Sequence, residues 1–359
     1  MRVAIVHYWL LKMRGGEKVV EALCRMLPAA DIFTLFYDPE HVSPVIRERK
    51  VTASFLNRFR AHHRSLLPLM PIALEHFDLR GYDLVVSSES GPAKGVLVPS
   101  GTRHVCYCHS PMRYLWELYP AYLHEWTPNP LKRALMAPLS NYLRLWDYAS
   151  AARVDTFIAN SENVRRRIWR TYRRESEVIR PPIAVESFYS KHPADYFLIV
   201  SELVPYKRID TAVRAFNATG RRLRIVGTGP EFRSLQAVAR SNIEFCGWVP
   251  DDQLRELYAT CRALVFPGEE DFGMTPIEAL ASGKPVIALG RGGAIESVPV
   301  CQPLGGVFYR EPNEADLTRA LEEFDKLEAQ VEPAALQQYA ARFSESEFRA
   351  RMKTILESA

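Results

Sequence analysis

The chain has 359 residues, of which 47% are hydrophobic and 25% are charged, and its formal net charge is +4. This composition excludes a disordered or fibrous protein, and the length exceeds what one hydrophobic core usually supports, so we expect two globular domains. No run of about 18 apolar residues and no signal-peptide pattern occurs, so the sequence predicts a cytoplasmic protein.

The charge is distributed unevenly along the chain. Residues 1–185 carry a net charge of +9, whereas residues 186–359 carry −5. The basic half suggests an anionic partner, such as a membrane surface, a lipid diphosphate or a nucleic acid, and a solvated basic surface is the alternative. The six cysteines are scattered, so we expect reduced thiols and no metal site.

The N-terminal half alternates β-rich runs with helical patterns, which predicts a mostly parallel sheet. Its strands are expected at residues 2–7, 31–36, 83–87, 103–108 and 156–159. Helices are expected at residues 17–27 and 161–174, the second with Ser161 as its N-cap. Pro181 and Pro182 interrupt both helix and sheet, so we place the domain boundary there.

The same alternation restarts after Pro182. Strands are expected at residues 196–201, 222–226, 243–246, 263–266 and 285–288. Helices are expected at residues 209–217, 230–240, 252–260, 276–282 and 314–328, and the tail from residue 333 is helical with a break near Ser344. The sequence therefore predicts two Rossmann-like α/β domains, residues 1–182 and 183–335, followed by a C-terminal helix at 336–359.

A strand, an acidic glycine-containing loop and a helix follow one another at residues 266–286. The backbone N–H groups around Gly273, Met274 and Thr275 are expected at the helix N-terminus. Unpaired donors and the helix dipole favour negative charge there. This helix start is therefore a candidate seat for a diphosphate.

Glu270 and Glu278 are separated by seven residues in this segment, so one lies in the loop and the other in the helix. The surrounding run Glu-Asp-Phe-Gly-Met-Thr-Pro-Ile-Glu-Ala-Leu-Ala-Ser-Gly-Lys-Pro-Val resembles the signature of glycosyltransferase family 4. The resemblance implies that Glu270 contacts the donor sugar near the reacting centre, that Glu278 binds the ribose hydroxyls, and that Phe272 belongs to the donor site. An acidic loop that only caps a helix is the alternative.

Residues 201–210 are similar to the family's Arg-Leu-x-x-x-Lys diphosphate clamp. Lys207 occupies the lysine position and is implied to be catalytic, whereas Glu202 stands where the family usually has arginine. Because two phosphates need positive charge as they leave, we infer that Arg208 supplements Lys207. A solvated Lys-Arg pair at a helix start is the alternative.

Glycine turns are expected to complete the donor pocket. Gly227 follows a strand and lets the backbone approach a ligand. The resemblance assigns the backbone around Gly247 and Val249 to the nucleobase edge. We also place three further residues near this pocket: Gly292, Gly293 and Glu296.

In the N-terminal half, Gly15 and Gly16 match the position where the family's backbone meets the diphosphate and the reacting sugar, with a plain turn as the alternative. His109 ends a predicted strand, and the following Ser-Pro-Met-Arg-Tyr run resembles bacterial polysaccharide mannosyltransferases. The resemblance implies that His109 hydrogen-bonds the donor sugar and that Arg113 and Trp116 contact the acceptor.

The resemblance covers nearly the whole chain and implies a GT-B fold, in which two Rossmann-like domains face each other and the C-terminal helix crosses back to the first. It implies a retaining hexosyl transfer without metal or other cofactor, with GDP-mannose or a related GDP-hexose as donor. The implied acceptor is a glycan or polyprenyl-diphosphate-linked saccharide in O-antigen, capsule or exopolysaccharide assembly.

Residues 55–77 combine arginines and histidines with leucines and phenylalanines. They suggest a basic amphipathic surface that contacts anionic lipid at the inner face of the plasma membrane, with a core-facing helix as the alternative. Other readings of the whole chain are a nucleotide-sugar epimerase of the same fold and a noncatalytic sugar-nucleotide or nucleic-acid binding protein. Aromatic RNA-stacking signatures are absent, so we expect no nucleic-acid partner, and the sequence leaves the oligomeric state open.

Overall fold

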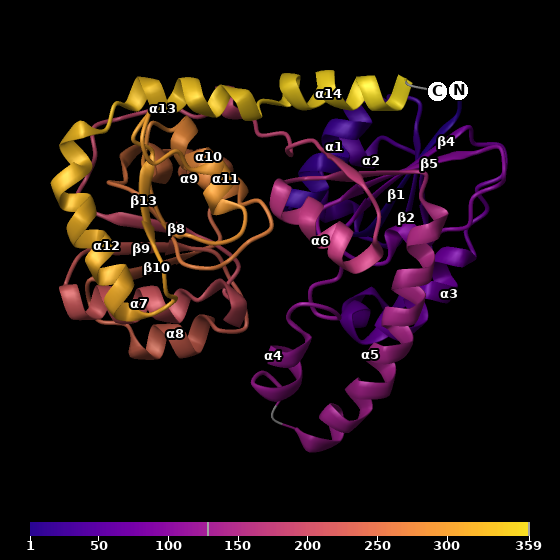
Figure 1. Cartoon of the computed structure of the whole chain (residues 1–359), viewed down its shortest axis with the longest axis horizontal. Coiled ribbons are helices and arrows are strands. Elements are labelled where there is room, and N and C mark those ends of the chain that lie inside the picture. The colour runs from indigo at the N-terminus through magenta and orange to yellow at the C-terminus, as the bar shows by residue number, and fades with distance from the viewer. Residues whose placement is uncertain (128, 358–359) are drawn as a thin grey trace. The chain divides into compact units, whose positions relative to one another are not determined.

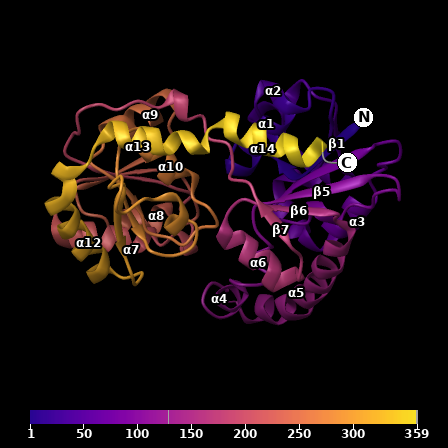
Figure 2. The same ribbon diagram turned by 45° about the horizontal axis from the view of Figure 1, so that its top comes forward.

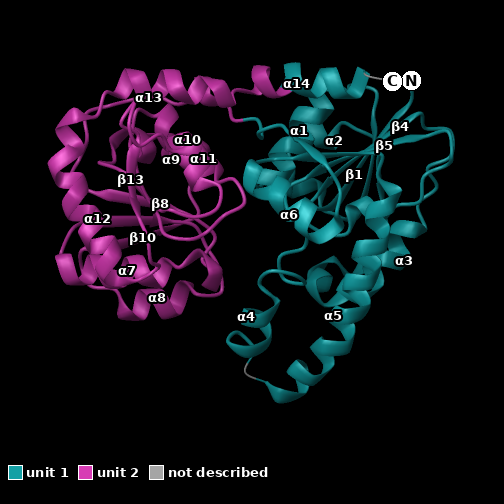
Figure 3. Ribbon diagram, viewed as in Figure 1, with its two compact units in different colours: residues 1–182, 349–359 teal, residues 183–348 magenta. Residues whose placement is uncertain are grey.

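The computed structural model describes residues 1–127 and 129–357 (Figure 1). The chain divides into two compact units, residues 1–182 with 349–359 and residues 183–348, which we call the first and second units (Figure 3). The segment 336–359, expected to pack back on the first domain, is shared between them. Its residues up to 348 belong to the second unit, and residues 358 and 359 lie outside the described residues.

The first unit contains a seven-stranded parallel sheet in the order β3-β2-β1-β4-β5-β6-β7. Its central strands β1, β4 and β5 are buried on both faces, as expected for a parallel sheet between two helical layers. The bounds are β1 Val3–Leu10, β2 Asp31–Tyr37, β3 Val51–Ala53, β4 Leu84–Glu89, β5 Arg103–Cys108, β6 Thr156–Ala159 and β7 Ser176–Val178. The two outermost strands, β3 and β7, were not predicted.

The helices of this unit are α1 Gly15–Met26, α2 Pro44–Arg47, α3 Met70–Glu75, α4 Tyr119–His124, α5 Pro130–Ser150 and α6 Glu162–Tyr172. The predicted N-cap of α6 is confirmed, because Ser161 Oγ accepts a 3.1 Å hydrogen bond from the Val164 N–H. Figures 1 and 2 both show α4 and α5 at the periphery of the first unit.

Residues 55–77 do not form one continuous amphipathic helix. Phe55–Leu69 is a chain of 3-10 turns, interrupted by non-helical backbone at Phe59 and His62, and α3 follows it. Leu56 is buried, and Leu67 packs against the hydrophobic core, whereas Phe55 and Phe59 are exposed. Part of this segment is therefore core-facing.

The second unit contains a six-stranded parallel sheet in the order β10-β9-β8-β11-β12-β13. Its strands are β8 Phe197–Val200, β9 Leu223–Val226, β10 Ile243–Gly247, β11 Leu264–Phe266, β12 Val286–Leu289 and β13 Gly306–Tyr309, of which β13 was not predicted. Its helices include α7 Ile209–Thr219, α8 Phe232–Val238, α9 Asp251–Thr260, α10 Met274–Ala281, α11 Ala294–Ser297, α12 Glu314–Leu327 and α13 Pro333–Ala340.

The predicted break near Ser344 is confirmed. A single 3-10 turn, Ala341–Phe343, separates α13 from the last helix, α14 Glu345–Glu357. Ser344 has extended backbone, so the helix cannot continue through it.

Each sheet has one point at which the strand order reverses, between β1 and β4 in the first unit and between β8 and β11 in the second. In open parallel sheets, ligands bind outside the carboxyl ends of the strands at such a point. Hydrophobic clusters cover both faces of the second sheet. The faces are therefore closed, and the carboxyl edge is the candidate binding edge.

Candidate functional site

In the second unit, Lys207 and Glu270 meet at the carboxyl edge of the sheet. Lys207 ends the 3-10 turn Pro205–Lys207 after β8, and Glu270 lies in the loop after β11. Their side chains form an ion pair and are 14% and 24% exposed. Burial alone would lower the pKa of Lys207, but Glu270 raises it, so the amine stays cationic. The edge presents a cation and a carboxylate side by side.

Two glycines hold the loop that carries Glu270. The Gly293 N–H donates a 2.9 Å hydrogen bond to the Glu270 carbonyl oxygen, and a side chain at Gly292 would collide with the same oxygen. Glu296 lies in α11, which begins directly after them. Gly292 and Gly293 therefore pack against this loop. The close packing explains why both positions are glycine.

The N-terminus of α10 forms where the sequence predicted it. Gly273 has a φ of +85°, which few other residues adopt, and it places Met274 and Thr275 in the first turn. Phe272 behaves differently, because its side chain is 3% exposed and its ring lies 5.9 Å from that of Phe343. The side chain of Phe272 therefore belongs to the hydrophobic core.

Glu278 lies on the inner side of α10 and is 5% exposed. Its Oε2 accepts a 2.8 Å hydrogen bond from the hydroxyl of Tyr258, which lies on α9. Burial, with a further contribution from Glu278, raises the pKa of Tyr258 far above its usual value, so the phenol remains a donor. Sequence reasoning missed Tyr258, although its position on the inward face of α9 was a signal.

The predicted glycine loop and nucleobase turn lie together. The Gly227 N–H donates a 2.7 Å hydrogen bond to the Gly247 carbonyl oxygen. Gly227 has a φ of +131°, and a side chain there would collide with the Ser201 carbonyl oxygen. Val249 is buried, whereas the neighbouring Trp248 is 77% exposed.

Arg208 does not point the way that the sequence suggested. Its guanidinium donates to the Pro312 carbonyl oxygen at 3.1 Å and lies 3.4 Å from Asp210, at the start of α7. Arg208 also has left-handed backbone with a φ of +54°, which turns its side chain away from the direction of Lys207. Of the two residues, Lys207 is the one paired with Glu270.

In the first unit, His109 directly follows β5. Its Nε2 lies 2.9 Å from Ser88 Oγ at the end of β4, and its carbonyl oxygen accepts a 3.0 Å hydrogen bond from Asn160. Burial, with a smaller effect of His7, lowers the pKa of His109 to about 3. The ring is therefore neutral near pH 7 and acts through hydrogen bonding rather than as an acid.

His7 and Glu17 form a buried pair that sequence reasoning missed. His7 Nδ1 lies 2.8 Å from the Ser88 carbonyl oxygen, and this nitrogen is the donor because a carbonyl oxygen only accepts. His7 Nε2 lies 3.8 Å from Glu17 and has no hydrogen-bond partner in the described part of the chain. Glu17 also accepts from the Arg14 N–H at 3.1 Å, which fixes the start of α1 at Gly15.

Gly16 lies against three of these side chains. A Cβ atom at Gly16 would be 3.4 Å from the Tyr8 hydroxyl, 3.5 Å from His7 and 3.6 Å from His109 Nε2. These are ordinary contact distances, so internal packing does not demand a glycine here. Gly16 and His109, two residues of the first unit that were predicted as site residues, thus lie close together. His7 and Tyr8, which were not predicted, lie beside them.

The two residues predicted to contact the acceptor have partners within the first unit. Arg113 is 13% exposed and lies 3.6 Å from Glu117. Trp116 Nε1 donates a 2.7 Å hydrogen bond to Asp147 on α5. Their role in acceptor binding stays a prediction.

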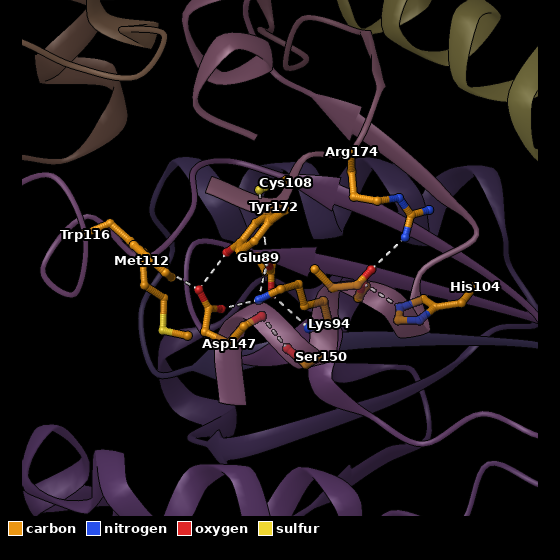
Figure 4. Close-up of polar contacts among 12 residues, drawn as sticks. Glu89, Lys94, His104, Cys108, Met112, Trp116, Asp147, Ser150, Tyr172 and Arg174 are labelled. Carbon is orange, nitrogen blue, oxygen red and sulfur yellow. Dashed lines mark hydrogen bonds and ion pairs between the residues drawn. The ribbon is translucent and has the colours of Figure 1, made fainter. Parts of the chain in front are cut away.

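Figure 4 shows the buried network behind Trp116. Lys94 forms ion pairs with Asp147 and, at 3.6 Å, with Glu89, and all three side chains are fully buried. Tyr172 donates at 2.9 Å to the same Asp147 oxygen as Trp116. Burial raises the pKa of Glu89 to about 7, although Lys94 opposes the shift.

Among residues 1–127 and 129–357, no group of three or more histidine, cysteine, aspartate or glutamate side chains is arranged to hold a metal ion. Within the same residues, no helix is both long enough and apolar enough to span a bilayer.

Two Rossmann-like units, each with one parallel sheet, have the architecture of the GT-B fold. HepE from Anabaena, solved in complex with UDP, has the same fold with a TM-score of 0.71 at 15% identity, over the full length of both chains. Sucrose-phosphate synthase from Thermosynechococcus elongatus aligns with a TM-score of 0.74 at 17% identity, over 99% of this chain and 98% of that one.

The family model "Glycosyltransferase Family 4" matches residues 13–187, and the model "Glycosyl transferases group 1" matches residues 185–343. The chain therefore belongs to the glycosyltransferases that carry these two domains.

Curated relatives match it over part of their length. An uncharacterized glycosyltransferase of Methanocaldococcus jannaschii is 27% identical over 45% of this chain and 47% of its own. The O-antigen chain mannosyltransferase RfbU of Salmonella typhimurium is 26% identical over 56% of this chain and 59% of its own.

We expect Gly16→Ala to leave the fold intact and to impair catalysis. The added methyl group fits at contact distance, so the free energy of unfolding should change by less than about 1 kcal/mol. The same methyl group would occupy the space that faces His109, so turnover of the nucleotide-sugar donor should fall at least about tenfold. Release of the nucleotide from the donor and thermal melting measure the two effects.

Gly101→Ala is the matched control for this substitution, because Gly101 has open space around it and precedes β5, whereas His109 follows that strand. Equal turnover in the Gly16→Ala and Gly101→Ala variants would contradict a ligand-facing role for Gly16.

We expect Glu89→Gln to change how stability depends on pH. In the folded protein Glu89 holds its proton up to about pH 7, against an ordinary pKa of 4.5, so the unfolded chain binds fewer protons in between. This group therefore makes the folded state less stable as pH rises through that window, by an amount on the order of 3 kcal/mol. Glutamine has no such titration, so the variant should gain stability relative to the wild type as pH rises.

Urea unfolding of both proteins across this pH window gives the difference in unfolding free energy. Any constant cost of the substitution cancels when the difference is followed across pH, and so do the titrations of groups that both proteins share. A difference that stays constant with pH would show that Glu89 titrates normally.

Proposed function

We propose that the protein is a retaining hexosyltransferase that transfers mannose from GDP-mannose and needs neither a metal ion nor another cofactor. The observation that carries this proposal is the Lys207–Glu270 pair at the carboxyl edge of the second sheet. It lies at the strand reversal, and the loop of Glu270 leads into the N-terminus of α10. Such an edge suits a ligand with both a diphosphate and hydroxyl groups, and a nucleotide sugar has both.

In this proposal, Lys207 and the first N–H groups of α10 stabilise the negative charge that develops on the leaving diphosphate. Glu270 accepts hydrogen bonds from the donor sugar. Glu278 accepts hydrogen bonds from the ribose hydroxyls. The hydrogen bond that it accepts from Tyr258 holds the carboxylate in one orientation. The backbone around Gly227, which is bonded to Gly247, forms the nucleoside side of the pocket.

The reaction breaks the bond between the anomeric carbon and a diphosphate oxygen, and the acceptor hydroxyl forms the new bond on the same face. A donor phosphate oxygen takes the proton, and the transition state resembles an oxocarbenium ion. No enzymic nucleophile is needed, so the protein contributes positioning and electrostatic stabilisation. His109, with its neutral ring, and the backbone at Gly15 and Gly16 hydrogen-bond the donor.

Names of the relatives support mannose as the transferred sugar. Besides the Salmonella O-antigen enzyme, a Mycobacterium tuberculosis protein named as a GDP-mannose-dependent phosphatidylinositol monomannoside mannosyltransferase is 35% identical over 28% of this chain and 30% of its own. We propose a lipid-linked or polysaccharide acceptor, with Arg113 and Trp116 on the acceptor side. The setting would be surface-polysaccharide assembly at the inner face of the plasma membrane.

Nucleotide binding is the first test of this proposal. We expect GDP without added metal to raise the melting temperature of the wild type more than UDP, ADP or dTDP does, because a ligand that binds the folded state stabilises it. Tyr258→Phe removes the hydrogen bond that orients Glu278 and should weaken GDP binding about threefold to tenfold, which corresponds to about 0.5–1.5 kcal/mol. Glu278→Ala should abolish most of the shift.

Glu322→Gln is the matched control, because Glu322 is exposed on α12 of the same unit. A preferential shift with UDP would keep the transferase and replace the donor. If no nucleotide shifts the melting temperature, the transferase proposal is contradicted, and a noncatalytic nucleic-acid binding protein becomes the leading alternative.

A further inference from the structure

The outward side of α5 is apolar although no described part of the first unit covers it. Leu131, Leu135 and Leu145 are 69%, 62% and 67% exposed, and Tyr142 and Tyr148 are about half exposed. Among the exposed positions of α5, Lys132 and Asn141 are the ones with a charged or amide side chain. We call this side of α5 the outer face.

The opposite side of α5 is fixed in the first unit. Leu139, Leu143 and Trp146 pack in a cluster with Met112 and Leu115. Asp147 on the same side is held by Lys94, Trp116 and Tyr172 in the buried network (Figure 4). Rotation of α5 would break this ion pair, so the helix cannot bury its outer face by turning.

A helix that is apolar all round is found in a protein core or in contact with lipid. The inner side of α5 is already in the core. Its outer face shows several bulky side chains in succession, which is more than the single exposed leucines of ordinary surfaces.

The charges around the outer face favour an anionic partner. Between residues 119 and 153, the described acidic residues are Glu125 and Asp147, and Asp147 is buried against Lys94. Lys132, Arg133 and Arg144 lie on α5 itself. The neighbouring segment 55–69, whose Leu67 packs on the inner side of α5, contains three more arginines and no acid, and its Arg60 lies 3.7 Å from Asp38.

We propose that the outer face of α5 lies in the headgroup region of an anionic bilayer and that its leucines and tyrosines insert into it. A helix of 21 residues is roughly 32 Å long and lies along the surface, with apolar side chains below and cations at the level of the lipid phosphates. Tyrosine suits this boundary, because its ring is apolar and its hydroxyl is polar. The inference rests on the proposed function in one respect: a lipid-linked acceptor would require the enzyme to contact the membrane.

Vesicle sedimentation of the full chain tests this inference. The wild type should bind vesicles of phosphatidylcholine with about one third phosphatidylglycerol and should bind pure phosphatidylcholine vesicles much more weakly. Replacing Leu135 and Leu145 together by glutamate should lower binding to the anionic vesicles at least about tenfold, because charge is inserted where the apolar contact forms. Its melting temperature should stay close to that of the wild type, since both leucines are exposed.

Val238→Glu is the matched control, because Val238 is 60% exposed in the second unit, and it should bind vesicles like the wild type. Equal vesicle binding of the wild type and the double variant would overturn the inference. So would loss of binding in Phe59→Glu alone, which would place the lipid contact in segment 55–69. A wild-type dimer in light scattering that the double variant dissociates would make the outer face a contact between two copies.

The GDP-dependent melting shift of the double variant separates this inference from the proposed function. A normal shift together with lost vesicle binding supports both. A missing shift in the wild type with lost vesicle binding in the variant would overturn the donor assignment and keep the lipid contact.

Discussion

The first unit depends on the ion pair between Lys94 and Asp147. Both side chains are fully buried, and a buried charge is tolerated only when it is paired and its remaining hydrogen-bonding positions are filled. Asp147 meets this condition by accepting from Trp116 and Tyr172. One carboxylate on α5 thereby joins the segment after β4, the segment after β5 and helix α6. These parts are distant in sequence, and the hydrophobic cluster of Met112, Leu115 and Leu143 packs beside the same ion pair.

The parallel sheets could be predicted from sequence because their central strands contain short apolar runs, such as Val3–Val6 in β1 and Phe197–Val200 in β8. Edge strands carry no such signal. β3 and β7 have three residues each and are not fully buried, so neither a continuous apolar run nor an alternation can be recognised. β13 begins with Gly306 directly after Gly305, a pair that indicates a turn, and the strand forms because β12 offers it a partner.

The residues of the candidate site also fall into those that the sequence could predict and those that it could not. Motifs around Lys207, Glu270, Glu278 and His109 indicated those residues, and the local geometry of α10 followed from Gly273 and Pro276. Tyr258 and Ser88 were missed because each is defined by a hydrogen bond to a residue about twenty positions away. The direction of Arg208 could not be predicted either, since it follows from a left-handed backbone angle that is unusual for arginine.

The ion pair between Lys207 and Glu270 also bears on how tightly any phosphate-bearing ligand is held. The two charges neutralise each other, so in the proposed function a phosphate that binds Lys207 has to compete with Glu270 for the same amine. Association is then an exchange of partners, and its net free energy is the difference between two similar interactions rather than the full strength of one. The same exchange runs in reverse once the phosphate compound is spent, because Glu270 can take the amine back and speed the departure of the product.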